Sequence, residues 1–245
     1  MPDTMSPKYR RVLLKLSGEA FGHGGKSGIS QDETAAIAQQ LKRVYDRGVQ
    51  LAVVVGGGNI LRGAHFSAAG DTIKPATADY MGMLATVMNG LALQDTLEKY
   101  GAETRLLSAV RVDMVAEPYI RRRAIRHLEK GRIVILAGGT GNPFVTTDTA
   151  AALRGMELNV EAVLKATKVD GIYTADPMKD PYAEKYDRLT YEEAIKKDLQ
   201  VMDVSAFDHC KKGKLPIVVF NYKMENAIEK VIAGHPIGTV VGAKL

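Results

Sequence analysis

Ile133–Asp148 reads IVILAGGTGNPFVTTD, a short β-branched run that breaks at glycines and a proline and ends in a carboxylate among hydroxyls. Apolar runs of this length bounded by glycine predict a buried strand. Glycines let the backbone approach a bulky ligand, and the start of a following helix presents free N–H groups to an anion. An aspartate among those donors indicates more than phosphate binding: it faces a cation or accepts a hydrogen bond from a ligand hydroxyl.

Strands and helices alternate in both directions from this stretch. The predicted strands are 10–17, 49–55, 104–110, 161–167, 216–220 and 239–242, and the predicted helices lie at 30–48, 79–94, 119–130, 147–154 and 224–233. This alternation favours an α/β fold, a three-layer αβα sandwich around a mostly parallel sheet. We expect a flexible segment at 1–9 and a single domain at 10–245.

Composition narrows the function classes. The 245 residues, 46% of them hydrophobic, are enough for a sizeable core. The single cysteine, Cys210, excludes an internal disulfide and fits a reducing compartment. We find no apolar run near the roughly 18 residues of a membrane span and no leader, so we expect a cytoplasmic protein without a membrane partner. We also expect no protein metal site, since His23 has no ligand partner at metal spacing.

Two further strand ends carry phosphate-binding signals. Lys15 interrupts the first apolar run just before Gly18 and either reaches solvent or binds phosphate at the carboxyl end of a strand. Glycines 56–58 follow the second strand but lack the third glycine of a dinucleotide fingerprint. Arg62 beyond them is either a phosphate fork or a solvated loop charge.

The glycine-rich loop at 22–28 nearly forms a P-loop. Ala20 occupies the position of the required first glycine, and the better helix start lies at Ser30, so we interpret it as a mobile loop. The helix at 79–94 is apolar nearly all round, which indicates burial on both sides or contact with another subunit. We place Asp79 in its first turn, either as a cap or as an acceptor for a ligand hydroxyl.

Two polar regions remain open to more than one interpretation. Arg121–Arg126 form the basic face of the helix at 119–130, which is either a solvated face or a contact for an anionic effector or subunit. Interleaved aromatics are lacking there, so we expect no nucleic-acid partner. Within the polar segment 168–188, Tyr173 either stacks on a flat ring or is an ordinary loop aromatic, and Asp176 accepts from a sugar or base.

In a parallel sheet the strand ends at residues 15–18, 56–58 and 138–141 converge on one crevice. Backbone N–H groups, two lysines and an arginine around one cleft stabilise charge on a transferring phosphoryl group, with Mg²⁺ held mainly by nucleotide phosphates. The residues alone therefore predict a phosphate-binding α/β domain.

The same blocks resemble the bacterial UMP kinases, or uridylate kinases, of the amino acid kinase fold family from about Tyr9 to the last strand. The matching blocks are LKLSGEA at 14–20, GGGN at 56–59 with Arg62-Gly63, Asp79 with MGMLAT at 81–86, GTGNPF at 139–144 with TTD at 146–148, and LKATKVDG at 164–171. The resemblance implies Mg²⁺-dependent transfer of the ATP γ-phosphoryl group to UMP, giving UDP in de novo pyrimidine nucleotide synthesis.

The resemblance also implies roles for individual residues. Lys15 and Asp148 are expected to be catalytic, with Lys165 and Asp203 as supporting charges near the γ-phosphate. The residues expected at ATP are Lys15, Leu16, Ser17, Gly18, Gly58, Arg62, Thr167, Tyr173 and Asp176. The residues expected at UMP are Gly57, Asp79, Thr140, Gly141, Asn142, Pro143, Phe144, Val145, Thr146 and Thr147.

The family further implies a homohexamer, inhibition by UTP and, in many members, activation by GTP. The loop at 22–28 and the basic helix depart most from the family pattern, which leaves GTP activation open. Two other hypotheses stand beside a UMP kinase. One is a kinase of the same fold that forms acyl phosphates on an amino acid or carbamate, which Asp79 and residues 140–147 disfavour. The other is a nucleotide- or oxyanion-binding relative without turnover, which Lys15 and Asp148 disfavour.

Overall fold

The computed structural model describes residues 7–24, 26–61, 72–175, 177, 179–197, 199 and 201–243. Two predicted ATP-site residues, Arg62 and Asp176, lie outside the described residues, as do residues 1–6 of the predicted N-terminal segment.

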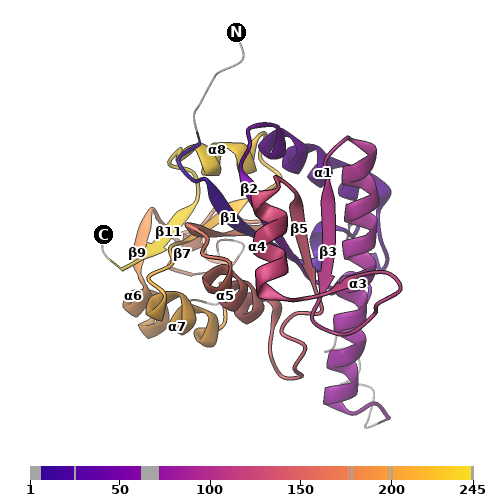
Figure 1. Ribbon diagram of the computed structural model, residues 1–245. Helices are drawn as coiled ribbons and strands as arrows, with labels where there is room; N and C mark the ends of the chain where they lie inside the picture. The colour runs from indigo at the N-terminus through magenta and orange to yellow at the C-terminus, as the bar shows by residue number, and fades with distance from the viewer. Residues whose placement is uncertain are drawn as a thin grey trace.

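A nine-stranded sheet runs through the centre of the molecule (Figure 1). Across the sheet the strands are β4 (Glu117–Pro118), β3 (Thr104–Ser108), β5 (Ile133–Ala137), β2 (Gln50–Val55), β1 (Arg11–Leu16), β6 (Ala162–Thr167), β10 (Ile217–Asn221), β11 (Thr239–Gly242) and β9 (Arg188–Thr190). Among the described residues only the β10–β11 pairing of this sheet is antiparallel. The prediction of a mostly parallel sheet is therefore confirmed.

Helices cover both faces of the sheet. One layer holds α1 (Gln31–Asp46), α3 (Pro75–Lys99) and α8 (Ala227–Ala233). The other holds α4 (Arg121–Glu129), α5 (Thr147–Glu157), α6 (Tyr191–Lys196) and α7 (Val204–Lys212). The three-layer αβα sandwich is confirmed.

Strand periodicity explains why two cores form. Successive side chains of a strand point to opposite faces, so Leu14 and Leu16 pack with the α1 layer while Leu13 packs with the α5 layer. Lys15 follows Leu13 by two residues and therefore points toward the α5 side. This places a charged group near the carboxyl end of a strand whose apolar side chains are all buried.

Several predicted elements differ from the observed ones. The helix predicted at 79–94 begins earlier, at Pro75, because proline suits the first helical turn. The polar segment 168–188 contains a small antiparallel pair, β7 (Ile172–Tyr173) and β8 (Lys185–Tyr186). The short 3₁₀ helix η1 (Gly18–Ala20) and α7 were not predicted. A capping box formed by Thr190 and Glu193 starts α6.

The described start of the chain is joined to the domain. The backbone N–H groups of Lys8 and Tyr9 donate to the carbonyl of Ile232 at 2.9 and 3.4 Å. The division into a segment at 1–9 and a domain at 10–245 stays a prediction. None of the helices formed by the described residues has both the length and the apolarity that a bilayer crossing requires.

A buried ion pair joins α8 to α1. The Glu229 carboxylate is 7% exposed and accepts from Arg43 Nε at 2.5 Å and Arg47 Nη2 at 3.0 Å. The Arg43 and Arg47 side chains are 41% and 32% exposed, so solvent screens part of the attraction.

We therefore expect Glu229→Gln to lower the free energy of unfolding by about 1–3 kcal/mol, because both arginine contacts lose the charge of their buried acceptor. Urea unfolding monitored by circular dichroism measures the change. The matched control is Asp46→Asn, which removes the exposed pair of Asp46 with Lys42 and should cost less than about 0.5 kcal/mol. Equal costs for the two variants would contradict the special role of the buried carboxylate.

Candidate phosphoryl-transfer site

Two buried lysines and one aspartate form the centre of the site. Lys15 and Lys165 are direct partners in the parallel pairing of β1 with β6, so both side chains point to the same face. Asp148 lies between them: its Oδ1 is 2.8 Å from Lys15 Nζ, and its Oδ2 accepts from Lys165 Nζ at 2.6 Å. The Lys15 contact has the distance but not the angle of a hydrogen bond. The predicted catalytic residues are thus brought together.

The start of α5 delivers Asp148 to the lysines. Thr146 caps the helix, because its hydroxyl oxygen accepts from the backbone N–H groups of Asp148 and Thr149 at 3.2 and 3.4 Å. Asp148 then falls in the first turn, where the helix dipole favours a negative charge. The local sequence TTD therefore places the carboxylate where two ammonium groups need it.

A second segment braces this helix start. The Thr146 hydroxyl donates to the Asp203 carboxylate, and the Thr149 and Ser205 hydroxyls lie 2.7 Å apart. The Lys165 ammonium also donates to the carbonyl of Val201. Asp203 is at the start of α7, so the predicted supporting charge reaches the site through Thr146.

The charges at the centre depend on one another. Burial opposes ionisation of Asp148, but the Lys15 and Lys165 charges outweigh it, and the pKa of the Asp148 carboxyl lies below its ordinary value. Burial also lowers the pKa of the Lys165 ammonium, an effect that Asp148 opposes and Lys15 reinforces. Removing the carboxylate would leave two like charges buried side by side.

A cavity of about 170 Å³ opens beside this centre. Its walls come from the turn after β2, from α3 and from the loop that follows β5. It is lined by Gly57, Gly58, Leu61, Ala78, Asp79, Gly82, Met83, Thr86, Gly139, Val145, Thr146 and Thr147. Gly57, Asp79, Val145, Thr146 and Thr147 among the predicted UMP residues thus line one cavity, whereas Thr140–Phe144 form the outer part of the loop.

Asp79 does not lie where we predicted. Because Pro75 starts α3 and Lys74 is the residue before it, the first turn of the helix contains no acidic residue, so Asp79 is not a cap. Its carboxylate instead accepts from the backbone N–H of Phe144 at 2.8 Å. Phe144 has a φ of 65° and its side chain is 78% exposed, so Asp79 holds the tip of the loop in a left-handed conformation.

The loop after β5 needs glycine at its first position. Gly138 has a φ of 75°, and a Cβ there would lie 2.9 Å from the backbone nitrogen of Val110. Its N–H donates to the Thr86 hydroxyl at 2.7 Å, which fixes the loop to α3. The sequence does not indicate this role of Thr86, because a hydroxyl inside an apolar helix has no local pattern that predicts a site residue.

The predicted ATP residues lie at neighbouring strand ends. Ser17 and Gly18 follow β1, and a Cβ on Gly18 would lie 2.3 Å from the backbone nitrogen of Gly58, so the turns after β1 and β2 touch. Thr167 ends β6, and Tyr173 lies on β7 with its hydroxyl donating to Asp170 at 2.6 Å. Leu16 is buried in the core of the α1 layer.

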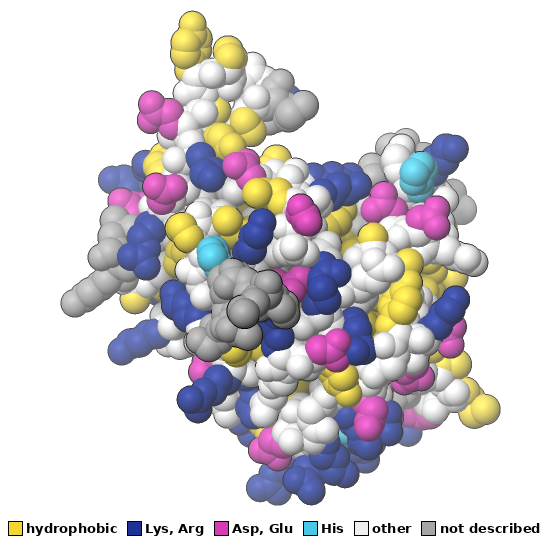
Figure 2. All heavy atoms as spheres, turned by 90° about the horizontal axis from the view of Figure 1, so that it is seen from above, with side chains coloured by type: hydrophobic (Ala, Val, Ile, Leu, Met, Phe, Trp, Pro, Cys, Tyr) yellow, Lys and Arg dark blue, Asp and Glu magenta, His cyan; other side chains and the backbone are white. Residues whose placement is uncertain are grey.

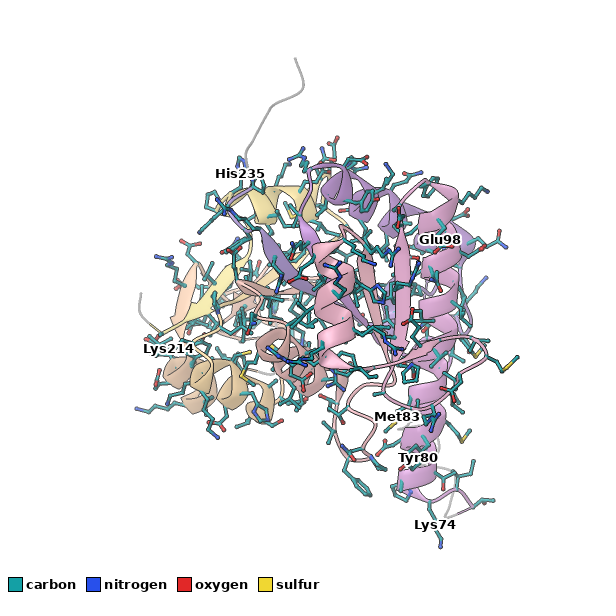
Figure 3. All side chains as sticks on the ribbon, in the orientation of Figure 1. Lys74, Tyr80, Met83, Glu98, Lys214 and His235 are labelled. Carbon is teal, nitrogen blue, oxygen red and sulfur yellow. The ribbon has the colours of Figure 1, made fainter. Side chains whose placement is uncertain are left out.

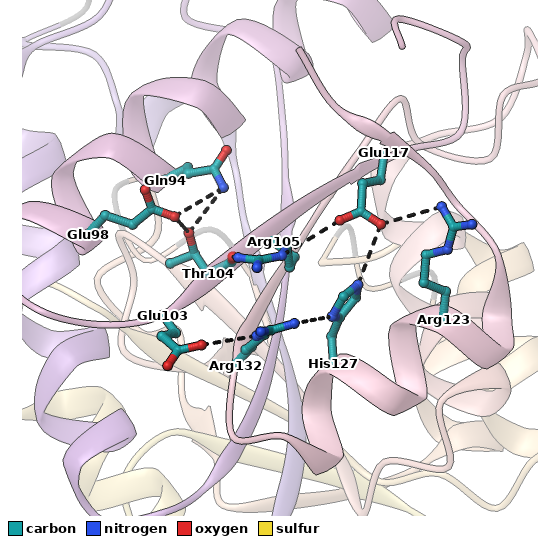
Figure 4. Close-up of polar contacts among 9 residues, drawn as sticks. All are labelled: Gln94, Glu98, Glu103, Thr104, Arg105, Glu117, Arg123, His127 and Arg132. Atoms are coloured by element: carbon teal, nitrogen blue, oxygen red, sulfur yellow. Dashed lines mark hydrogen bonds and ion pairs between the residues drawn. The ribbon is translucent and has the colours of Figure 1, made fainter. Parts of the chain in front are cut away.

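The basic helix α4 makes contacts that limit its free charge. Arg105, Arg123 and His127 all approach Glu117, and Arg132 joins His127 to Glu103 (Figure 4). Acidic and basic side chains are also interspersed over much of the face shown in Figure 2, although Lys and Arg gather at its lower edge. Part of the arginine charge therefore fixes α4 to the edge of the sheet.

Two larger hollows among the described residues are lined neither by the Lys15–Asp148–Lys165 centre nor by the glycine turn at 56–58. One of about 420 Å³ lies around Lys8, Arg188 and His235, and one of about 410 Å³ lies between α1 and α3. Figure 3 shows His235 at the end of the molecule opposite to Lys74 and Tyr80, which mark the start of α3. The smaller cavity is the one lined by Gly57 and Gly58 and by Thr147 at the start of α5, next to Asp148 in the chain.

Comparison with known proteins agrees with this geometry. Residues 10–221 match the model of the amino acid kinase family. The structure is similar to UMP kinase from Bacillus anthracis (36% identity, TM-score 0.93, 97% of both chains) and to UMP kinase from Ureaplasma parvum (31%, 0.89, 95% of this chain and 98% of that chain). Uridylate kinase from Archaeoglobus fulgidus is 28% identical with a TM-score of 0.74, over 94% of this chain and 99% of that chain. The predicted resemblance is confirmed: the chain belongs to the amino acid kinase family.

Proposed function

We propose that this chain transfers the γ-phosphoryl group of ATP to UMP, giving ADP and UDP. The observation that carries the proposal is the Lys15–Asp148–Lys165 centre beside a cavity lined by Gly57, Asp79 and Thr147. The names of the similar structures, UMP kinase and uridylate kinase, support the choice of acceptor. We assign the reaction to de novo pyrimidine nucleotide synthesis in the cytoplasm.

In this reaction a phosphate oxygen of UMP attacks the γ-phosphorus of ATP, and the bond to the β–γ bridging oxygen breaks. Charge spreads over the transferring group, so positioned cations and backbone N–H groups lower the barrier. Lys15 lies near the carboxyl end of β1 with its ammonium 2.8 Å from Asp148, and we assign it to the transferring phosphoryl group. Asp148 keeps the two lysines close, and Lys165 is held by Asp148 and Val201.

We propose that Mg²⁺ enters with ATP. The described residues contain no cluster of three His, Cys, Asp or Glu side chains. In nucleotide sites Mg²⁺ uses one or two carboxylates together with phosphates and water. Asp148 and Asp203 are the carboxylates at this site that would serve. The bound ion would neutralise charge on the phosphate oxygens.

We also propose regulation and assembly. UTP carries the same base and sugar as UMP, so we expect it to inhibit by occupying the UMP cavity, and we retain GTP as an effector to be tested. Tyr80, Leu84 and Met88, about half exposed, form one stripe of α3 at i, i+4 spacing. Exposed apolar stripes favour contact with another subunit, which supports the expected homohexamer.

The acceptor is tested by offering Mg-ATP with UMP, CMP, dUMP, aspartate, glutamate or carbamate, with and without GTP or UTP. We expect turnover of UMP to exceed that of every other acceptor, and inhibition by UTP. Release of ADP measures the rate. Phosphorylation of an amino acid or of carbamate would replace the proposal by an acyl-phosphate-forming kinase. Nucleotide binding without any turnover would favour a binding protein.

Lys15→Ala tests the role of the lysine in the transition state. We expect kcat to fall by about 100-fold or more while the Kd for UMP changes little, because the ammonium acts on the transferring group. The matched control is Lys42→Ala, a half-buried lysine of α1 that pairs with Asp46, and this variant should keep full activity. An unchanged kcat in Lys15→Ala would remove this residue from the mechanism.

Asp148→Asn tests the charge balance of the centre. The substitution leaves Lys15 and Lys165 without a counter-charge, so we expect the free energy of unfolding to fall by about 3 kcal/mol at neutral pH. Because the folded-state pKa of Asp148 is lowered, its contribution is full above the ordinary value of 3.8 and is lost as pH falls through the lowered pKa. Urea unfolding of both proteins between pH 7 and pH 3 measures this, and a difference that grows on acidification would contradict the assignment.

A further inference from the structure

Asn59 and Asn89 form a buried pair that the mechanism above does not use. Asn89 Nδ2 donates to Asn59 Oδ1 at 2.7 Å, and Asn59 Nδ2 donates to Asn89 Oδ1 at 3.1 Å. The two residues are 6% and 0% exposed. Asn59 follows the turn after β2, while Asn89 lies in the middle of α3.

Each carboxamide also holds a backbone carbonyl. Asn89 Nδ2 donates to the carbonyl of Gly56 at 2.7 Å, and Asn59 Nδ2 donates to that of Gly28 at 2.9 Å. The Gly28 N–H in turn donates to the carbonyl of Asn59 at 2.8 Å. Because both outer partners are carbonyls, each amide must present its nitrogen to them, so only one orientation satisfies the network. The pair thus joins α3, the turn at 56–58 and the loop that ends at Gly28.

The glycine turn at 56–58 has no side chains that could fix its conformation. It consists of three glycines, the residue type with the greatest backbone freedom. It is also tightly packed: a Cβ on Gly18 would lie 2.8 Å from Asn59 Oδ1, and one on Gly56 would lie 2.6 Å from the Gly18 nitrogen. Gly57 and Gly58 line the cavity beside Asp148. A shift of Asn59 would therefore move both glycine turns that face the nucleotides.

We propose that Asn59 and Asn89 are positioning residues that hold the glycine turn at 56–58 against the phosphate of the nucleoside monophosphate and couple it to Gly28. The inference rests on the proposed function, because it assumes that a phosphorylated nucleoside occupies the cavity. Neutral amides suit this task, since the network fixes the backbone without adding a charge beside the phosphate.

The test separates the phosphate from the rest of the ligand. Calorimetric titration gives the Kd of uridine and of UMP for wild type, Asn89→Ala and Asn59→Ala. We expect the ratio of the uridine Kd to the UMP Kd to fall about tenfold in both variants, while the uridine Kd changes little. The reason is that the turn can no longer fix its N–H groups on the phosphate. The kcat for UMP should fall as well.

Thr96→Ala is the matched control on the same helix. Its hydroxyl donates to the carbonyl of Ala92 at 2.7 Å, within the same helix and not to the glycine turn. It should lower the melting temperature without changing the ratio of the two Kd values. An unchanged ratio in Asn89→Ala, whatever its melting temperature, would reduce the pair to a structural role and overturn the inference.

Wild-type protein gives a second measurement that does not depend on how a variant folds. Hydrogen exchange is followed in the peptides that contain Gly56–Gly58 and Gly28, with uridine or UMP bound. We expect UMP to slow exchange in both peptides more than uridine does. Protection of the turn without protection at Gly28 would exclude the coupling. Wild type that binds no UMP would instead defeat the proposed function, so the two failures are distinguishable.

Discussion

The structure depends on one carboxylate placed between two buried ammonium groups. The parallel register of β1 with β6 sets Lys15 beside Lys165, both less than a tenth exposed, and like charges so close are tolerated only with a counter-charge. Asp148 supplies it. Asp148 lies in the first turn of α5, so this helix has to begin next to the two lysines on the same face of the sheet. Thr146 provides the cap, and the glycines after β5 provide the tight loop that brings the chain back to the sheet.

The same arrangement explains why the site is prepared for an anion. Two lysines and one aspartate leave an excess positive charge in a partly desolvated place, where electrostatic interactions are stronger than in water. A polyphosphate satisfies that excess, whereas a neutral ligand does not. Asp203 accepts from the Thr146 hydroxyl and its charge also acts on Lys165, so a second carboxylate contributes to the field at the helix start. Burial and charge therefore select the ligand class together.

The sequence predicted the layers and the strand ends well, because hydrophobic periodicity and glycine breaks are local signals. It also singled out Lys15, because a lysine inside a buried run is unusual, and Asp148, because a carboxylate among anion-binding N–H groups is an odd choice for a site that holds only phosphate. The catalytic roles expected of both residues came from the family resemblance. It could not give the register that sets Lys15 opposite Lys165, because strand pairing is a long-range property. Asp79 was misplaced in its helix because the start of α3 is marked by Pro75 at the first helical position, and the prediction followed the apolar periodicity that begins later. Thr86 was missed because its partner, the N–H of Gly138, lies 52 residues away.

The side chains of Asn59 and Asn89 have to bind backbone carbonyls at the glycine turn without adding a charge beside the nucleotide. A lysine at Asn89 would add a cation that competes with Lys15 for phosphate, and an aspartate there would repel both the phosphate and the carbonyl of Gly56. A leucine would leave that carbonyl and Asn59 without partners in a buried place, at a cost of about 1–3 kcal/mol for each unsatisfied group. An amide pair meets every donor and acceptor and adds no charge. Charged residues can then be kept for the nucleotide, while neutral hydrogen bonds hold the backbone that surrounds it.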